Sequence, residues 1–392
     1  GYELEYINDA FRKNWIVPLG ENVNEFEKAM SAYMGKCYPV ALSAGTAALH
    51  LAMILAGVKP GDTVFCQSLT FSASANPIAY CGAKPVFIDS ERETWNMDPV
   101  ALRRAFELYG TPKVVVAVHL YGNPAKLDEI AAICREHDVP LIEDAAEALG
   151  STYNGQKCGT FGEFGGLSFT GNKVITTSGG GMLLCQTEEN AKHALKLATQ
   201  ARENVPWYQH EEIGYNYRMS NVIAGVVRGQ YPYLEEHIAQ KKAIWERYRD
   251  CLRGLPVEMN PFDPETSCPN YWLSALVIDR SAMCRQVRSD NDALYLPEQG
   301  KSCPTEILEA IAGINAEGRP IWKPMHMQPM YRMNGFITPS GEGRAKTNAY
   351  IAGGVEDVGA DIFERGLCLP SDNKMTKEQQ EQIIKVIRRC FE

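Results

Sequence analysis

A single lysine, Lys173, stands inside the stretch SFTGNKVITT (168–177). Gly171 and Asn172 precede this lysine, a β-branched run follows it, and more glycines occupy 179–181. Because glycine carries no side chain, such a segment lets the backbone pass close to a flat ring. A lysine considered alone is more often a solvated surface charge, so its chemistry depends on the groups that accompany it.

A carboxylate earlier in the chain is the first such group. Asp144 ends the run VPLIED (139–144), which has the pattern of a buried strand. An unpaired buried charge is costly, so Asp144 either caps the following helix or pairs with a cation of a ligand. Pyridoxal phosphate requires a carboxylate for its pyridinium nitrogen and a lysine that forms a Schiff base. Asp144 and Lys173 together therefore predict that cofactor.

A phosphate group needs a site of its own, and a turn of small residues offers one. The segment SAGTAAL (43–49) leads into a predicted helix whose free N–H groups and dipole favour an anion, although most such turns are plain caps. Ser168 adds a hydroxyl shortly before the lysine. Phe71, in SLTFSAS, follows a predicted strand and either stacks on the ring or packs in the core.

The elements that must position these residues alternate between strand and helix. Apolar runs at 113–122 and 139–144, and a strand–loop–helix–strand order over 62–90, predict a mainly parallel sheet with right-handed crossovers. Ligands gather at the carboxyl ends of the strands in such sheets. The polar or aromatic residues expected at that edge are Ser43, Phe71, His119, Asp144 and Ser168.

The pattern changes in the second half of the chain. Residues 235–255 have the pattern of one long amphipathic helix, and a Pro-rich part with short strands such as 271–279 follows. We therefore predict two domains, 1–240 and 241–392, with this helix linking them.

The composition limits the classes of function that fit. A formal net charge of −9 argues against a nucleic-acid partner or an anionic membrane surface, because phosphate binding needs a basic face. No stretch of about 18 apolar residues is present, so no membrane-spanning helix is expected. The cysteines are scattered without a C-x-x-C pair, which indicates reduced thiols in a cytoplasmic protein rather than a metal site or a disulfide framework.

Motifs spread in order over nearly the whole chain resemble those of the pyridoxal-phosphate-dependent sugar aminotransferases, which act on nucleotide-linked keto-sugars. They are SAGTAAL, SLTFSASANPIAYCGAKPVFID, VHLYGN, LIEDAAEALGS, GTFGEFG, SFTGNK, GYNYRMSN, WKPMH and GLCLPS. The resemblance implies an α/β fold of the aspartate-aminotransferase-like type (fold type I). It implies a mainly parallel seven-stranded sheet flanked by helices, a smaller C-terminal α/β domain, and a homodimer with shared active sites.

The resemblance also implies roles for single residues. Lys173 would be the Schiff-base lysine and Asp144 the partner of the pyridine nitrogen, while Glu147 falls where many members place Gln or His beside the ring hydroxyl. A carboxylate there makes that hydrogen bond only when it is protonated. The other implied cofactor contacts are Gly45, Thr46, Phe71, Ser168 and, from the neighbouring subunit, Asn216. Implied contacts to the sugar or its diphosphate, each with an ordinary core or surface alternative, are His119, Tyr121, Arg218, Lys323 and His326.

A narrower resemblance concerns the substrate. The stretches TQAREN, GYNYRMSN and TTSGGGM are similar to those of members that aminate C4 of UDP-2-acetamido-4-keto-2,4,6-trideoxyglucose on the bacillosamine route, with L-glutamate as the amino donor. A GDP- or dTDP-linked sugar, or a 3-keto sugar, is an alternative. A dehydratase of the same fold is another, although known dehydratases carry His at the position of Lys173. Intact Lys173 and Asp144 also argue against a non-catalytic sensor or scaffold.

Overall fold

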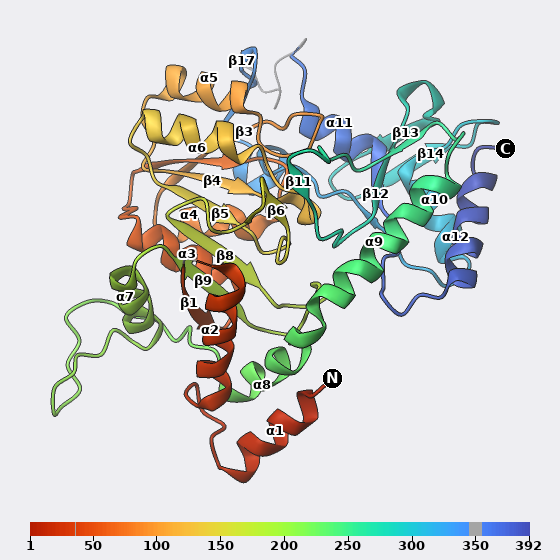
Figure 1. Cartoon of the computed structure of the whole chain (residues 1–392). Coiled ribbons are helices and arrows are strands. Elements are labelled where there is room, and N and C mark those ends of the chain that lie inside the picture. Colours follow the sequence, from red (N-terminus) through yellow and green to blue (C-terminus); the bar gives the residue numbers. More distant parts are fainter. Residues whose placement is uncertain (36, 345–354) are drawn as a thin grey trace.

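A nine-stranded sheet forms the centre of the computed structural model, which describes residues 1–35, 37–344 and 355–392 (Figure 1). Strands β8, β5, β4, β2, β3 and β16 run parallel to their neighbours in that series, whereas β9 is antiparallel to both β1 and β8. The mainly parallel sheet is thus confirmed. In spatial order the strands are β1 (Tyr38–Leu42), β9 (Gly181–Cys185), β8 (Phe164–Ser168), β5 (Leu141–Asp144), β4 (Val114–Val118), β2 (Thr63–Gln67), β3 (Lys84–Ile88), β16 (Gly335–Thr338) and β17 (Gly341–Glu342).

The expected number of seven strands is wrong for the described residues, because two strands from the C-terminal half join this sheet. Strand β16 pairs in parallel with β3, with Phe336 opposite Phe87, and β17 pairs with β16. Their pairing covers the backbone groups that β3 would otherwise expose at the sheet edge. The large sheet therefore draws residues from both sides of the predicted boundary at 240/241.

Helices cover both faces of the sheet, which explains the continuous apolar run in β4. Val114 and Val116 pack in one core cluster with residues of α3 and α7, whereas Val115 and Ala117 pack in another with residues of α5 and α6 (Figure 1). A strand buried on both faces needs no polar alternation. The helices around the sheet are α1 (Glu3–Arg12), α2 (Glu21–Met34), α3 (Gly45–Leu55), α4 (Asn76–Tyr80), α5 (Pro99–Tyr109), α6 (Leu127–Glu136), α7 (Glu188–Ala198) and α8 (Asn221–Gln230).

A long helix, α9 (Leu234–Cys251), leads from this sheet to a second, four-stranded sheet (Figure 1). The helix begins where the sequence predicted and ends shortly before the expected residue 255. The second sheet consists of β10 (Val257–Met259), β12 (Ala275–Ile278), β18 (Gly366–Cys368) and β15 (Arg319–Pro320). Around it lie α10 (Pro304–Ala312), α11 (Val358–Arg365) and α12 (Lys377–Arg389), together with the hairpin β13 (Arg285–Arg288) and β14 (Ala293–Leu296).

A minor sheet joins the two halves of the chain, since β11 pairs with β6 and β6 pairs with β7. These short strands are β11 (Ser267–Cys268), β6 (Thr152–Tyr153) and β7 (Gln156–Lys157). In the described ranges, no helix has the length and apolar character needed to cross a membrane.

Candidate active site

Lys173 and Asp144 lie at the same edge of the central sheet. Strands β5 and β8 are parallel neighbours with Asp144 opposite Gly166. Asp144 therefore ends β5 beside the C-terminal half of β8. The chain leaves β8 at Ser168 and reaches Lys173 in the following turn. Parallel strands end at one edge, and the crossover between them therefore brings together two residues that are distant in sequence.

The amine of Lys173 lies between a carboxylate and an aromatic ring. Its Nζ is 3.7 Å from Oε1 of Glu147 and 3.9 Å from the ring centroid of Trp272, and 15% of the side chain is exposed. The indole Nε1 of Trp272 donates a hydrogen bond to the carbonyl of Asn172 at 2.8 Å. The tryptophan thus fixes the residue before the lysine and attracts the ammonium form of the lysine through its π face.

Burial shifts the pKa values of Lys173, Asp144 and Glu147, each in the direction that favours the neutral form of the group. It lowers the pKa of the Lys173 ammonium, against the opposing charges of Glu147 and Asp144. It raises the pKa of Asp144, although Ser74 and a backbone N–H bond to this carboxyl, and it raises the pKa of Glu147 to about 7. A lysine with a lowered pKa is a nucleophile and base closer to neutral pH than a free lysine.

The carboxylate of Asp144 accepts hydrogen bonds, but nearby cations compensate little of its negative charge. Its Oδ2 accepts from Oγ of Ser74 at 2.5 Å, and its Oδ1 accepts from the backbone N–H of Ala146 at 3.1 Å. The second bond closes a turn, because no helix begins between Asp144 and β6, so the structure contradicts the interpretation of Asp144 as a helix cap. The side chain is buried, and a ligand cation would compensate its charge.

Glu147 is held by an unusual turn after β4. The backbone N–H of Tyr121 donates to Oε2 of Glu147 at 2.7 Å, and Tyr121 has a φ of 56° and ψ of 23°. Non-glycine residues seldom adopt this left-handed conformation, which is retained only where the surroundings enforce it. The turn therefore aims a backbone donor at the carboxylate that faces Lys173.

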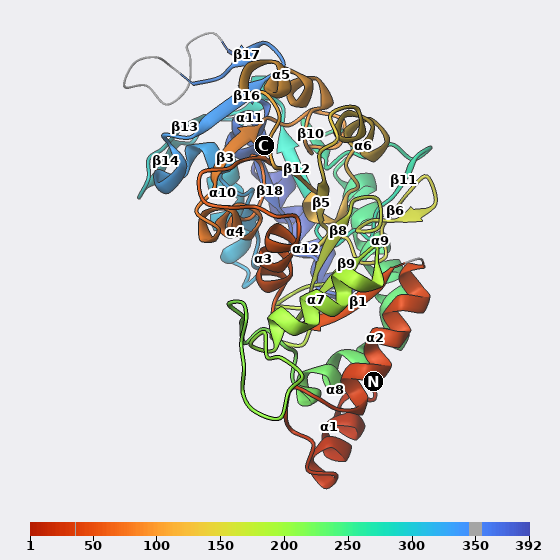
Figure 2. The same ribbon diagram turned by 90° about the vertical axis from the view of Figure 1, so that its left-hand side faces the viewer.

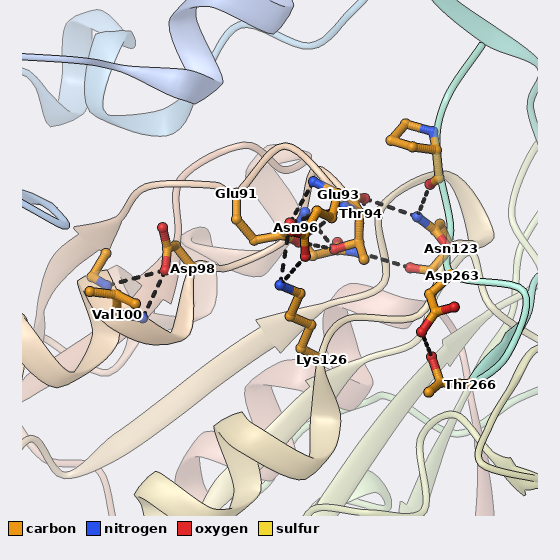
Figure 3. Close-up of polar contacts among 12 residues, drawn as sticks. Glu91, Glu93, Thr94, Asn96, Asp98, Val100, Asn123, Lys126, Asp263 and Thr266 are labelled. Carbon is orange, nitrogen blue, oxygen red and sulfur yellow. Dashed lines mark hydrogen bonds and ion pairs between the residues drawn. The ribbon is translucent and has the colours of Figure 1, made fainter. Parts of the chain in front are cut away.

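Two buried amides, Asn96 and Asn123, hold the backbone of this turn; Figure 3 shows them among the neighbouring polar groups. Oδ1 of Asn96 accepts from the N–H of Leu120 at 2.9 Å, and Nδ2 of Asn96 donates to the carbonyl of Asn123 at 2.9 Å. Nδ2 of Asn123 in turn donates to the carbonyls of Thr94 and Pro261. Asn96 and Asn123 were not among the predicted site residues, because nothing local to either amide shows which distant backbone group it meets.

The N-terminus of α3 forms a cradle beside the lysine. Helix α3 begins at Gly45, and no side chain caps its first turn. A Cβ on Gly45 would lie 2.8 Å from Cβ of Ser168, so glycine is what lets the helix start approach the end of β8. A Cβ on Gly181 would lie 2.2 Å from the carbonyl carbon of Ala44. The glycines behind Lys173 thus allow β9 to pass against the cradle.

Aromatic side chains form a wall beside the lysine, which we call the aromatic wall. Phe71, which is 53% exposed, lies 5.3 Å from Trp322 between ring centroids. Trp322 lies 4.9 Å from Tyr121 and 6.2 Å from Trp272, measured in the same way. The aromatic wall consists of Phe71, Tyr121, Trp272 and Trp322. Trp272 and Trp322 were not predicted as site residues, because their segments converge only in the folded chain.

These features fit pyridoxal phosphate. An uncapped helix N-terminus and a small-residue turn suit the phosphate, Phe71 suits one face of a flat ring, and a buried carboxylate suits a ring cation. A nearby amine with a lowered pKa suits covalent attachment. The residues that would hold the cofactor are Gly45, Thr46, Phe71, Asp144, Glu147, Ser168 and Lys173.

Burial argues against the expected sugar contacts of His119 and Tyr121, whereas that of Arg218 stays a prediction. His119 is fully buried; its Nδ1 accepts from the N–H of Ala125 at 3.1 Å, so its Nε2 donates to Glu143 at 2.9 Å. Tyr121 is also buried, and its Oη accepts from the N–H of Trp322. The guanidinium of Arg218 bonds to Glu27 and to the carbonyl of Ala41. These groups support the site from within the protein.

His326 is likewise a core residue. The hydroxyl of Ser68 accepts from the N–H of His326 and donates to its Nδ1 at 2.6 Å, so Nε2 of His326 donates to Asp357 at 2.8 Å. The imidazole also stacks on Phe336, with ring centroids 3.6 Å apart. This serine–histidine–aspartate chain is buried, so a substrate cannot reach its hydroxyl. Among the residues predicted to contact the sugar or its diphosphate, Lys323 is partly exposed, with 24% of its side chain accessible.

Comparisons with known proteins identify the family of the chain and confirm its fold. The model of the DegT/DnrJ/EryC1/StrS aminotransferase family matches residues 2–388. EpsN of Bacillus subtilis (strain 168), to which a pyridoxal phosphate-dependent aminotransferase function is ascribed, is 45% identical over 100% of this chain and 93% of its own. The GDP-perosamine synthase of Caulobacter vibrioides is 36% identical over 84% of each chain. The solved structure of the aminotransferase TlmJ from Streptoalloteichus hindustanus has a TM-score of 0.82 and 27% identity, over 100% of this chain and 96% of that one.

Proposed function

Because the chain belongs to the DegT/DnrJ/EryC1/StrS family of pyridoxal phosphate-dependent sugar aminotransferases, we propose that it moves the amino group of L-glutamate to the C4 ketone of a nucleotide-linked keto-deoxysugar. The membership confirms the predicted cofactor and the sugar aminotransferase activity. The carbon that is aminated, the nucleotide and the amino donor belong to the proposal.

One observation carries the proposal. The amine of Lys173 lies against Glu147 and Trp272, on the sheet edge where Asp144 ends β5 and α3 begins without a cap. A covalent amine, a ring-nitrogen partner and a phosphate cradle thus occur together. Intact Lys173 also speaks against the dehydratase alternative.

The chemistry follows from these side chains. Pyridoxal phosphate, when bound, supplies an electron sink for the charge that develops at the carbon bearing the amino group. Lys173 binds the cofactor and, once an amino donor has displaced it, is the base that takes the proton from Cα of L-glutamate. Lys173 then returns a proton to C4 of the sugar in the second half-reaction. Asp144 keeps a proton on the ring nitrogen.

The two acidic neighbours of Lys173 have different tasks. Asp144 acts as an ionised group, because a ring cation would favour its charged form over its neutral form. Burial raises the pKa of Glu147 to about 7, which favours its protonated form, and a protonated Glu147 would donate to the ring hydroxyl of the cofactor. A carboxylate can then serve where many relatives carry Gln or His.

For the nucleotide, we propose UDP, and for the sugar 2-acetamido-4-keto-2,4,6-trideoxyglucose. Support comes from the stretches TQAREN, GYNYRMSN and TTSGGGM, which resemble members acting on that sugar. GDP is the second candidate, because a relative that is 36% identical is named a GDP-perosamine synthase.

A panel of nucleotide-linked keto-sugars tests the function. We expect the holoenzyme with L-glutamate to convert the UDP-linked 4-keto-sugar into an amino sugar, which mass spectrometry detects together with 2-oxoglutarate. The GDP- and dTDP-linked sugars and a 3-keto sugar serve as competitors, and the Lys173→Ala variant is the control. Loss of a sugar hydroxyl without amination would assign the chain to the dehydratases, and no conversion in the whole panel would contradict the proposal.

We also propose a homodimer with shared sites, in which Asn216 reaches the phosphate site of the second copy. Asn216 is exposed, between Tyr215 and Tyr217, whose rings stack 5.0 Å apart. Both rings pack against His50 of α3, and the hydroxyl of Tyr217 lies 3.1 Å from Nδ1 of this histidine. The flanking tyrosines therefore anchor the segment 215–217 to α3, and the amide of Asn216 stays exposed.

Mixed dimers test the shared site. A Lys173→Ala chain is combined with a chain that carries Asn216→Ala and Tyr208→Ala, Tyr208 being strongly exposed in the same segment. If sites are shared, one site of the heterodimer holds all the defects and the other holds none, so each heterodimer should regain about half of the wild-type turnover and an equimolar mixture after random exchange about a quarter. Two inactive parents that stay inactive after verified subunit exchange would show that each chain completes its own site.

A further inference from the structure

Lys323 and Arg332, two cations outside the Lys173 site, both pair with the carboxylate of Asp290. Nζ of Lys323 lies 2.8 Å from Oδ1 of Asp290, and Nη2 of Arg332 contacts the same oxygen. The side chains of Lys323, Arg332 and Asp290 are 24%, 17% and 42% exposed, so water reaches the group. Both cations lower the pKa of Asp290 to about 2, which keeps this carboxylate ionised throughout the neutral range.

The cation pair lies next to the aromatic wall. Lys323 directly follows Trp322, whose ring neighbours Trp272, and Trp272 carries the amine of Lys173 on its face. The indole rings of Trp322 and Trp272 therefore connect the backbone of Lys323 with the reacting amine. In a nucleotide-linked keto-sugar, the sugar ring separates the diphosphate at C1 from the ketone at C4. The α-carboxylate of an amino donor, by contrast, is attached to the reacting carbon itself and would bind closer to Lys173.

Asp290 lies at the tip of the hairpin β13–β14, which forms a two-stranded sheet of its own at the margin of the molecule (Figure 2). Ser289 closes the tip through its N–H and through its hydroxyl, which accepts from the N–H groups of Asn291 and Asp292. Arg288, the last residue of β13 before this tip, donates to the carbonyl of Phe363 at 2.6 Å and so ties this end of the hairpin to α11. The turn therefore forms without the carboxylate of Asp290, which instead tethers the tip to the cations.

We propose that Lys323 and Arg332 bind the diphosphate of the nucleotide-linked substrate, and that Asp290 occupies this site until the substrate displaces it. This inference rests on the proposed function. A diphosphate brings more charge and more acceptor oxygens than one carboxylate, so it forms stronger charge-assisted hydrogen bonds to the same donors. Exposed ion pairs are individually weak, so the side chain of Asp290 can leave the two cations at small cost while the backbone of the hairpin stays tied to α11.

Titration of the holoenzyme with inorganic diphosphate tests the site, with calorimetry as the measurement. Asp290→Asn should bind diphosphate about three- to fivefold more tightly than the wild type, because the competing charge is gone. Lys323→Met should bind it about tenfold more weakly, because a charge-assisted bond is lost. Matched controls come from the exposed pair Arg103–Glu136 between α5 and α6, where Arg103→Met and Glu136→Gln should leave the affinity unchanged.

Two results would overturn the inference. One is wild-type diphosphate affinity in Asp290→Asn or in Lys323→Met, with thermal unfolding showing that the variant is folded. The other is an equal effect of Asp290→Asn on binding of glutarate, which would assign the site to the carboxylate of the donor. The titration needs no turnover, so a holoenzyme that aminates sugars without these changes in affinity overturns this inference alone. Diphosphate binding as expected, without amination of any sugar, would overturn the proposed function alone.

Discussion

A Lys173→Ala variant is expected to turn over about 10⁴-fold more slowly than the wild type, or worse, because it lacks both the covalent anchor of the cofactor and the base that moves the Cα proton. The visible absorbance of the lysine-bound cofactor should disappear as well. The position of the amine against Glu147 and Trp272 motivates this expectation.

Borohydride reduction followed by peptide mapping locates the attachment directly. Reduction should fix the cofactor on Lys173 and block tryptic cleavage there, so that residues 158–192 appear as one labelled peptide. Lys241 is the natural competitor, since burial lowers its pKa to about 8 and its Nζ donates to the carbonyl of Ser371. A Lys241→Met variant should therefore keep the label. A label on any peptide without Lys173 would contradict the assignment.

An Asp144→Asn variant should slow the proton-abstraction step by about 10²- to 10³-fold while cofactor content falls much less. The amide cannot hold the ring-nitrogen proton as a carboxylate does, so the bound ring becomes a weaker electron sink. Asparagine can still accept from the N–H of Ala146, which means that this turn contact survives and the charge alone is removed. Single-turnover kinetics with glutamate measures the step.

A pure helix cap provides the matched control for Asp144→Asn. Asp98 caps α5 by accepting from Val100 and Ala101, so Asp98→Asn should leave the single-turnover rate at the wild-type value. If Asp144→Asn behaves like Asp98→Asn, then the charge of Asp144 has no part in the reaction and the ring-nitrogen role is wrong.

The sequence by itself determined the features that depend on local pattern. Apolar runs such as that of β4 established buried parallel strands, because a strand covered on both faces needs no polar residues. Parallel strands end at one edge, so the order of the elements was enough to bring Asp144 and Lys173 together. The turn before α3 was also evident locally, since small residues at a helix start leave N–H groups open to an anion.

Only the tertiary structure decided the contacts that cross large sequence separations. Trp272 meets Lys173, and Asn96 shapes the turn of Tyr121, through packing that no nearby residue encodes. His119 and His326 have the same local pattern whether exposed or buried, and only burial against Glu143 and Asp357 shows that their nitrogens are occupied. The pairing of β16 with β3 and of Asp290 with Lys323 likewise depends on how the C-terminal half lies against the large sheet. Local periodicity specifies which face of an element is buried, whereas the partner on that face is selected by the packing of the whole chain.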